Sequence, residues 1–265
     1  MPVPVPVRLR LFLILFLFSL VLATAVYAGP PYITDDPEPV EFQHWEFYVA
    51  SISSKIGGDW SGTAPHFEIN YGVIPNVQLH MIIPLAYDVP PDGSAHYGFG
   101  DMELGTKIRF LQETNWIPEA ATFPLLELPS GNANDNLGNG RVTAYFPIWL
   151  QKDWKTWTLY GGGGYGINNA PGFHNWGFVG AVLQKQVVSN LALGAEVYHQ
   201  TVSEPDFPNQ GTAFNIGAVY DFSDHRHLLF SAGRSISGPV DFQCYIAYQF
   251  TFDNSIFRFW SQNGR

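Results

Sequence analysis

The sequence predicts an all-β protein: a transmembrane up-and-down antiparallel β-barrel of about 12 strands, after a cleaved signal peptide. Three observations predict this fold. An apolar leader opens the chain, apolar and polar side chains alternate through most of the rest, and the connections between alternating segments are short and long in turn. Composition agrees, because charged residues make up only 14% of the chain, against about 25% in a typical soluble domain, while aromatic residues reach 16%.

The leader covers residues 1–28. It combines basic residues, an apolar run from Leu11 to Leu22 and small residues before Gly29, which is the arrangement of a secretory signal peptide cut after Ala28. The apolar run is shorter than the roughly 20 residues that a spanning helix needs. An uncleaved anchor is therefore the less favoured alternative, and we expect an exported protein.

The chain is acidic, with a formal net charge of −10. An acidic protein does not attract nucleic acid, so we expect no nucleic-acid partner. The single cysteine, Cys244, can form neither an internal disulfide nor a multi-cysteine metal site. After the leader, no apolar run is long enough to cross a bilayer as a helix, so a membrane location requires strands.

The alternation is clearest in "NVQLHMIIPLAY", residues 76–87, where one face is apolar from Val77 to Tyr87 and the other carries Gln78 and His80. A period of two residues indicates a strand. Twelve such segments follow one another, approximately at 41–53, 63–72, 76–87, 99–111, 117–128, 140–150, 155–166, 174–185, 189–201, 211–221, 226–235 and 240–252. The predicted barrel therefore spans residues 41–252.

The last segment ends in "YQFTF", with Tyr248, Phe250 and Phe252 on one face and Gln249 and Thr251 on the other. A sheet in lipid must close on itself, and its outer face is apolar with aromatic side chains where hydrocarbon meets headgroups. We expect the three aromatic residues to face outward at the periplasmic rim of the closing strand. A soluble β-sandwich or lipocalin-like barrel is the alternative, and it would turn apolar residues inward.

The connections alternate in length between the predicted strands. Short ones such as "VIP" and "QKDW" alternate with long ones such as "SKIGGDWSGT" and "PSGNANDNLGNG", as in bacterial outer-membrane barrels, whose periplasmic turns are short. Both chain ends would then lie on the short-turn, periplasmic side. Residues 29–40 are too rich in proline for a central strand, so we expect a periplasmic segment that covers or enters the mouth. We expect residues 253–265 to form a periplasmic tail.

Ionisable residues on the polar faces of the predicted strands are the candidate site, because the polar face of such a barrel lines the lumen. They are Glu46, His66, Glu68, His80, Asp101, Glu103, Lys107, Arg109, Arg141 and Glu196. Two hypotheses remain open. The groups pair across strands and brace a closed interior, or they line a selective pore whose constriction involves Glu68, His80, Asp101, Glu103, Lys107 and Arg109.

Two other kinds of site are weaker alternatives. His66, Glu68 and His80 lie on neighbouring strands, and imidazole and carboxylate groups are zinc ligands, yet paired lumen histidines are more often hydrogen-bonded. A lipid-hydrolysing barrel would need a nucleophile within reach of a base, for which His199 near Ser203 is the sole suggestion. We therefore expect no enzyme, no metal and no cofactor.

Several stretches resemble the MetA-pathway phenol-degradation family of outer-membrane transporter-like barrels. They are "GPPYITDDPEPV", "HWEFYVAS", "YGVIPNVQLHMIIPL", "GFGDMELGTKIRF" and "SAGRSISGP". The resemblance extends over almost all of the chain after the leader. The resemblance implies an outer-membrane channel for small aromatic or hydrophobic solutes, with membrane lipid and the barrel-assembly machinery as partners. The tail beyond Phe252 departs from the family pattern, in which barrels usually stop at the terminal aromatic residue.

Overall fold

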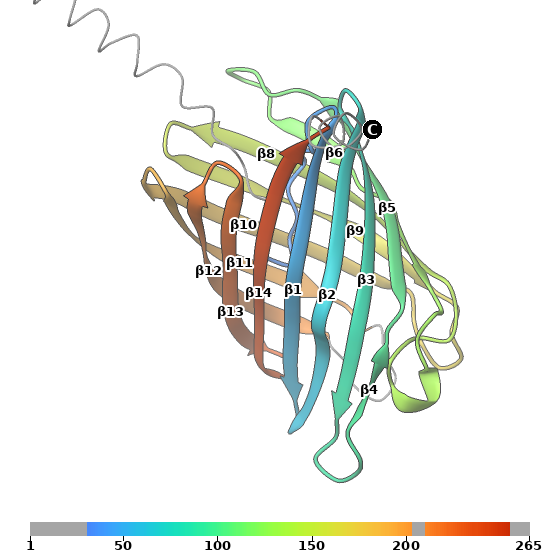
Figure 1. Ribbon diagram of the computed structural model, residues 1–265. Coiled ribbons are helices and arrows are strands. Elements are labelled where there is room, and N and C mark those ends of the chain that lie inside the picture. Colours follow the sequence, from blue (N-terminus) through green and yellow to red (C-terminus); the bar gives the residue numbers. More distant parts are fainter. Residues whose placement is uncertain (1–30, 203–209, 255–265) are drawn as a thin grey trace, which may run out of the picture.

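The computed structural model describes residues 31–202 and 210–254, which form one closed antiparallel β-barrel (Figure 1). Its strands are β1 (His44–Ile56), β2 (Asp59–Ile74), β3 (Val77–Val89), β4 (His96–Phe99), β5 (Met102–Leu111), β6 (Glu119–Thr122), β7 (Leu125–Leu128), β8 (Thr143–Trp154), β9 (Trp157–Asn168), β10 (Trp176–Val188), β11 (Leu191–Gln200), β12 (Gly211–Ser223), β13 (Arg226–Ser237) and β14 (Val240–Asp253). A short 3₁₀ helix, η1 (Ala133–Asp135), lies in the loop before β8. Within these residues no helix is long and apolar enough to cross a membrane.

The strand segments make a barrel of twelve strands. Strands β4 and β5 together pair with β3 and act as one barrel strand, and β6 and β7 together pair with β8 and act as another. Strands β1 and β14 close the barrel with a register that runs from His44 opposite Asp253 to Ile56 opposite Val240. The predicted up-and-down barrel of about twelve strands is confirmed.

The two faces of the wall are as the alternation predicts. On β14, Gln243 and Gln249 point inward and are buried, whereas Ile246 and Phe250 point outward and are exposed. Exposed large apolar side chains occur in this way along the wall, so its outer face suits hydrocarbon and its inner face is polar. A soluble barrel would have the opposite arrangement, and that alternative is wrong.

Short turns lie at one end of the barrel and most long loops at the other. One long connection was predicted wrongly, because "SKIGGDWSGT" is mostly strand and the turn between β1 and β2 is only Gly57 and Gly58. Both glycines have positive φ, 59° and 97°, a conformation that glycine adopts without a steric penalty. The high glycine content of the stretch therefore marks a tight hairpin.

Two predicted strands are interrupted. Pro124, which has no N–H to donate, separates β6 from β7, and Gly100 with Asp101 separates β4 from β5. The strand predicted from residue 140 begins at Thr143, so Arg141 belongs to the preceding loop and is exposed. The predicted strands were placed by alternation alone, which does not register a missing hydrogen-bond donor.

Residues 31–40, called the inner segment below, run inside the barrel (Figure 1, dark blue). The Pro31 carbonyl accepts a hydrogen bond from Ser231 on β13, and the Val40 N–H donates to Gln78 on β3 at 2.8 Å. Between these two contacts, the Thr34 N–H binds Glu196 on β11, which lies across the barrel from β3, so the segment crosses the lumen. The expectation was a periplasmic segment covering or entering the mouth, and the structure places it deep inside.

The wall makes room for the inner segment with glycine. Gly180 on β10 faces inward, and a Cβ atom there would collide with Thr34 Oγ1. A Cβ on Gly217 of β12 would lie 2.9 Å from the Tyr32 ring, closer than side chains ordinarily pack. The close approach of the segment to the wall therefore depends on the missing side chains.

An aromatic girdle surrounds the short-turn end of the outer face. Trp45 stacks on Tyr71 at 4.2 Å, Tyr248 packs against Phe250 at 4.7 Å, and Phe252 stacks further out on Trp45 at 6.3 Å. The predicted aromatic closing strand, Tyr248, Phe250 and Phe252, contributes to this girdle. The predicted signal peptide, residues 1–28, and the tail beyond Asn254 lie outside the described residues.

Candidate functional site

The lumen holds two cavities. The outer pocket, about 330 Å³, lies at the long-loop end and is lined mainly by β7 to β11 and the loop before β8. The inner cavity, about 1490 Å³, extends from the short-turn end to the middle of the barrel. Ile33, Glu103, Leu125 and Tyr145 line both, so the two cavities meet at these four side chains.

The inner segment supplies one of the four residues of this boundary, Ile33. The Ile33 side chain is 49% exposed although it lies in the lumen, because it projects into the space between the cavities. The other three boundary residues belong to wall strands. A solute crossing the barrel would therefore meet the inner segment at the junction.

Lys107 on β5 fastens the inner segment. Its ammonium lies 3.1 Å from Asp35 and 3.4 Å from Asp36, and the residue is only 4% exposed. The Phe123 ring, 5.0 Å away, shields the pair. Removing one partner of a buried ion pair typically costs about 3–5 kcal/mol because the remaining charge is left without compensation. Lys107 is thus an anchor for the segment.

Beside this anchor, His80 connects two strands. Its Nε2 lies 2.9 Å from Glu103 and its Nδ1 lies 2.7 Å from Asn70, while Glu68 is 3.6 Å from Nδ1. The predicted residues His80, Glu68 and Glu103 are therefore brought together. Each has a partner within the wall, as expected of groups that brace an interior.

Glu46 and His66 complete the wall facing the inner cavity. Glu46 accepts a hydrogen bond from the Tyr48 hydroxyl at 2.7 Å, and that hydroxyl accepts one from Gln249 at 2.8 Å. His66 lies 2.7 Å from the Thr63 hydroxyl. The Gln249 bond ties β14 to β1 across the seam where the barrel closes, and the His66 bond lies within β2.

Glu196 on β11 is fully buried and holds the tip of the inner segment. Its carboxylate accepts the Thr34 N–H at 2.6 Å, the Ile33 N–H at 3.4 Å and the Asn215 amide at 2.6 Å. A carboxylate that accepts several N–H bonds is well satisfied even in a dry interior. This residue, predicted to line a lumen, in fact binds backbone.

Arg109 lies at the short-turn mouth. It donates to Asn76 at 2.8 Å and to Glu119 at 3.3 Å. Burial raises the pKa of Glu38, on the nearby inner segment, to about 8, and the neighbouring carboxylates add to the shift while Arg109 opposes it. The pKa of Asp36 is raised to about 6, chiefly by burial, with Lys107 opposing the rise.

Two predicted residues do not join the lumen network. Asp101, between β4 and β5, accepts the backbone N–H of Gly131 at 2.9 Å and of Asn139 at 2.6 Å, and so fixes the loop before β8. Arg141 is exposed in that loop. The period-two pattern had extended both strands over residues that the structure places in loops.

The weaker alternatives gain no support from the geometry. Among residues 31–202 and 210–254, no group of three or more His, Cys, Asp or Glu side chains is arranged to hold a metal. His199 Nδ1 lies 3.0 Å from the Thr212 hydroxyl on the outer face, and among the described residues no hydrogen bond orients its other ring nitrogen. Ser203, the suggested nucleophile, lies outside the described residues.

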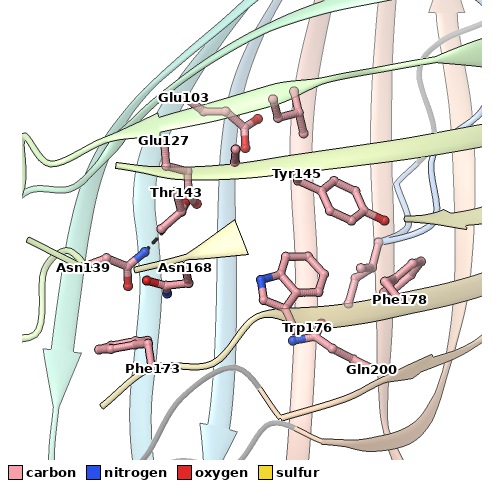
Figure 2. A pocket seen from close by; sticks show the side chains of 13 residues that line it. Glu103, Glu127, Asn139, Thr143, Tyr145, Asn168, Phe173, Trp176, Phe178 and Gln200 are labelled. Atoms are coloured by element: carbon pink, nitrogen blue, oxygen red, sulfur yellow. Dashed lines mark hydrogen bonds between the residues drawn. The ribbon is translucent and has the colours of Figure 1, made fainter. Parts of the chain in front are cut away.

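Sequence reasoning missed the outer pocket. Figure 2 shows Tyr145, Trp176 and Phe178 on one side of it and Glu127 with Thr143 on the other. Tyr145 and Trp176 stack at 4.8 Å with an interplanar angle of 10°. Their inward positions follow from the alternation, but aromatic residues had been assigned to the lipid face. The anchoring carboxylates Asp35 and Asp36 were missed because no pattern places a proline-rich segment inside a barrel.

Comparison with known proteins agrees with the fold. The sequence model of the family described as "Putative MetA-pathway of phenol degradation" matches residues 60–243. The COG4313 outer membrane channel from Pseudomonas putida F1 superposes with a TM-score of 0.68 at 16% identity, over 82% of this chain and 98% of that one. No curated protein matches the chain.

Two porins are more distant structural neighbours. The KdgM porin, solved in complex with disordered oligogalacturonate, gives a TM-score of 0.53 at 8% identity over 77% of this chain and 99% of that one. The NanC porin gives 0.52 at 9% identity over 77% and 98%. At such identities the likeness shows the fold alone. Fold and family together locate the barrel in the bacterial outer membrane.

Proposed function

Because the chain belongs to the family described as "Putative MetA-pathway of phenol degradation", we propose that it is an outer-membrane channel that admits small aromatic or other hydrophobic solutes. One observation carries the proposal. An outer pocket lined by stacked aromatic rings meets a larger cavity on the opposite side, and the inner segment stands between them. Ligand pockets are typically concave and combine aromatic or apolar surface with placed polar groups, and the outer pocket joins the two kinds in about equal share.

The path runs along the barrel axis. A solute enters the outer pocket from the long-loop, extracellular end and packs against the aromatic rings. It then passes Ile33 when the inner segment shifts, and leaves through the inner cavity toward the periplasm. The anchors at Lys107 and Glu196 set the free energy that this shift requires.

A barrel with a permanently closed interior is the second candidate. The specific observation in its favour is the buried bonding of the inner segment, whose contacts with Lys107, Glu196 and Ser231 fill the middle of the lumen. Both candidates imply membrane lipid around the outer face and the barrel-assembly machinery as the partner that inserts it. Neither assigns catalysis to the chain.

Single-channel conductance in a planar bilayer separates the two candidates. We expect small, brief conductance steps from the refolded protein, and larger, longer ones after deletion of residues 31–40, because the deletion joins the two cavities. Phenol added on one side should interrupt the current of the deletion variant by occupying the outer pocket.

The matched control is the full-length protein with Glu113→Gln, a change at the Lys152 ion pair outside both cavities. Its conductance should equal that of the unmodified protein. A deletion variant that migrates as a folded barrel on an unheated gel and yet stays electrically silent would move the conclusion to the closed barrel.

A further inference from the structure

We propose that the outer pocket sorts aromatic solutes by the group they carry, with Glu127 as the specificity-determining residue. The site accepts a one-ring solute that bears a hydrogen-bond donor, such as a phenol hydroxyl or an amine, and rejects an aromatic carboxylate. This inference rests on the proposed function and names the solute class of the same path.

The size and the aromatic wall of the pocket fit one ring. An apolar cavity of about 150 Å³ is enough to bind benzene, and the outer pocket holds about 330 Å³. Trp176 lies parallel to Tyr145, and Phe178 stacks on Tyr198 at 5.6 Å, so rigid flat surfaces form this side. Such surfaces favour aromatic solutes through stacking.

On the opposite wall, only one oxygen of the Glu127 carboxylate accepts hydrogen bonds from the described residues. Glu127 Oε2 accepts hydrogen bonds from the Thr143 hydroxyl at 2.6 Å and the Asn139 amide at 3.1 Å. Among the described residues no hydrogen bond reaches Glu127 Oε1, and that oxygen is not fully buried. An orientated carboxylate oxygen facing a cavity is an acceptor that awaits a donor.

The charge around the pocket has one sign. Its lining contains the carboxylates Glu103 and Glu127 and no Lys, Arg or His side chain among the residues that the structure describes. Glu103 already binds His80 at 2.9 Å, so Glu127 is the acceptor left over. A solute carboxylate placed here would face like charge without a cation, and like charges repel more strongly beside protein than in bulk water.

The donor requirement separates a phenol from toluene. A phenol hydroxyl can donate a hydrogen bond to the Glu127 carboxylate, whereas toluene cannot. Tyr145 contributes its ring to the pocket, while its hydroxyl is buried and is not exposed to a bound solute.

Asn139 is a positioning residue rather than a separate contact. Asp101 binds the Asn139 N–H at 2.6 Å, and this holds the loop before β8 so that the Asn139 amide reaches Glu127. The loop therefore fixes which oxygen of the Glu127 carboxylate remains open to the pocket.

Binding of four one-ring probes to the full-length protein in lipid nanodiscs tests the inference by isothermal titration calorimetry. The probes are phenol, benzylamine, toluene and benzoate. A hydrogen bond to a charged group contributes enough free energy for about a tenfold change in affinity. We expect phenol and benzylamine to bind at least about tenfold more tightly than benzoate, with toluene between them.

Glu127→Gln should reduce the preference for benzylamine over benzoate by about tenfold or more, because it removes the charge and keeps the shape. Glu113→Gln, the same change outside both cavities, should leave all four affinities unchanged. Thr143→Val, which removes one of the two bonds that orient the carboxylate, should give a smaller loss of preference. Migration as a folded barrel on an unheated gel qualifies each variant.

The outcomes separate the two levels of the proposal. If the protein binds the probes, toluene included, and Glu127→Gln keeps the original order of affinities, the sorting role of Glu127 is wrong and the aromatic channel stands. If the unmodified protein binds none of the four, the sorting role and the aromatic channel are both contradicted. Loss of discrimination in Glu127→Gln alone supports the inference.

Discussion

Glu38 carries an unusual proton affinity for a carboxyl group. Burial raises its pKa to about 8, the negative charges of Asp36, Glu119 and Asp153 add to the rise, and Arg109 opposes it. A carboxyl whose pKa is higher in the folded protein than in the free chain stabilises the docked inner segment while it is protonated. That contribution is complete below the ordinary value of 4.5 and is lost as the pH rises through about 8.

We therefore expect the inner segment to be held more firmly in mildly acidic than in alkaline solution. Thermal unfolding in detergent should give a higher Tm at about pH 6 than at about pH 9, and Glu38→Gln should reduce that difference. A Glu38→Gln variant with the same pH dependence as the unmodified protein would show that Glu38 does not titrate in this range.

At the scale of single residues, the sequence predicts which side chains point into the lumen better than it predicts which residues they bind. The inward positions of Glu68, His80 and Lys107 follow from the period of two, and the structure places all three in the lumen. The partners of these residues cannot be predicted in the same way, because Asp35 and Asp36, which bind Lys107, are distant from it in the sequence. Asp101 was assigned to the lumen by the same period, since alternation continues across a break in hydrogen bonding.

The inner segment and the strands that carry it form one packing unit. Gly180 on β10 and Gly217 on β12 have no side chain where Thr34 and Tyr32 lie, so the segment packs directly against the backbone of the wall. Since these glycines lie on strands that are otherwise regular, their role is to leave room for the Thr34 and Tyr32 side chains.

Gly180→Val should displace the segment. The new side chain would occupy the position of Thr34 Oγ1, so we expect conductance to rise toward that of the protein without residues 31–40. Gly177→Val is the matched control on the same strand, because the nearest atom to its Cβ position is Thr201 Cγ2 at 4.0 Å. Equal conductance of the two variants would mean that the contact at Gly180 does not hold the segment.

Whether a strand or segment can be predicted from the sequence depends on whether local patterns or long-range contacts determine it. Twelve strands were predicted because alternation is local, and the structure confirms their number. The hairpin at Gly57 and Gly58 was mistaken for a long loop because glycine content does not distinguish a two-residue turn from a flexible connection. The course of residues 31–40 could not be predicted, since every contact that fixes it is long-range.

At the scale of the whole molecule, the lumen holds two basic side chains surrounded by carboxylates. Lys107 and Arg109 lie on one strand and face the inner cavity, whereas carboxylates on the inner segment and on β1, β2 and β5 surround them. A unit charge about 10 Å from a passing ion changes its energy in water by about 0.4 kcal/mol, or about twofold in partition. Two basic side chains thus have a measurable influence on ion selectivity.

Replacing Lys107 and Arg109 by Gln should shift selectivity toward cations by about twofold or more, because the surrounding carboxylates would lose their compensating charges. The reversal potential in a salt gradient measures this shift. Lys152→Gln, at an ion pair outside both cavities, is the matched control and should leave the reversal potential unchanged. An unaltered potential in the double variant would place the ion path away from these residues.

The contacts of the inner segment also order events in time. Thr34 binds Glu196, and Pro31 binds Ser231, partners that are 162 and 200 residues away along the chain. Closing so large a loop has an entropic cost that only a finished binding surface can offset. Residues near the start of the chain therefore reach their final positions after β11 and β13 have joined the wall. Burial of the inner segment can report the completion of folding, since a barrel that has not assembled its last strands has nothing to hold it.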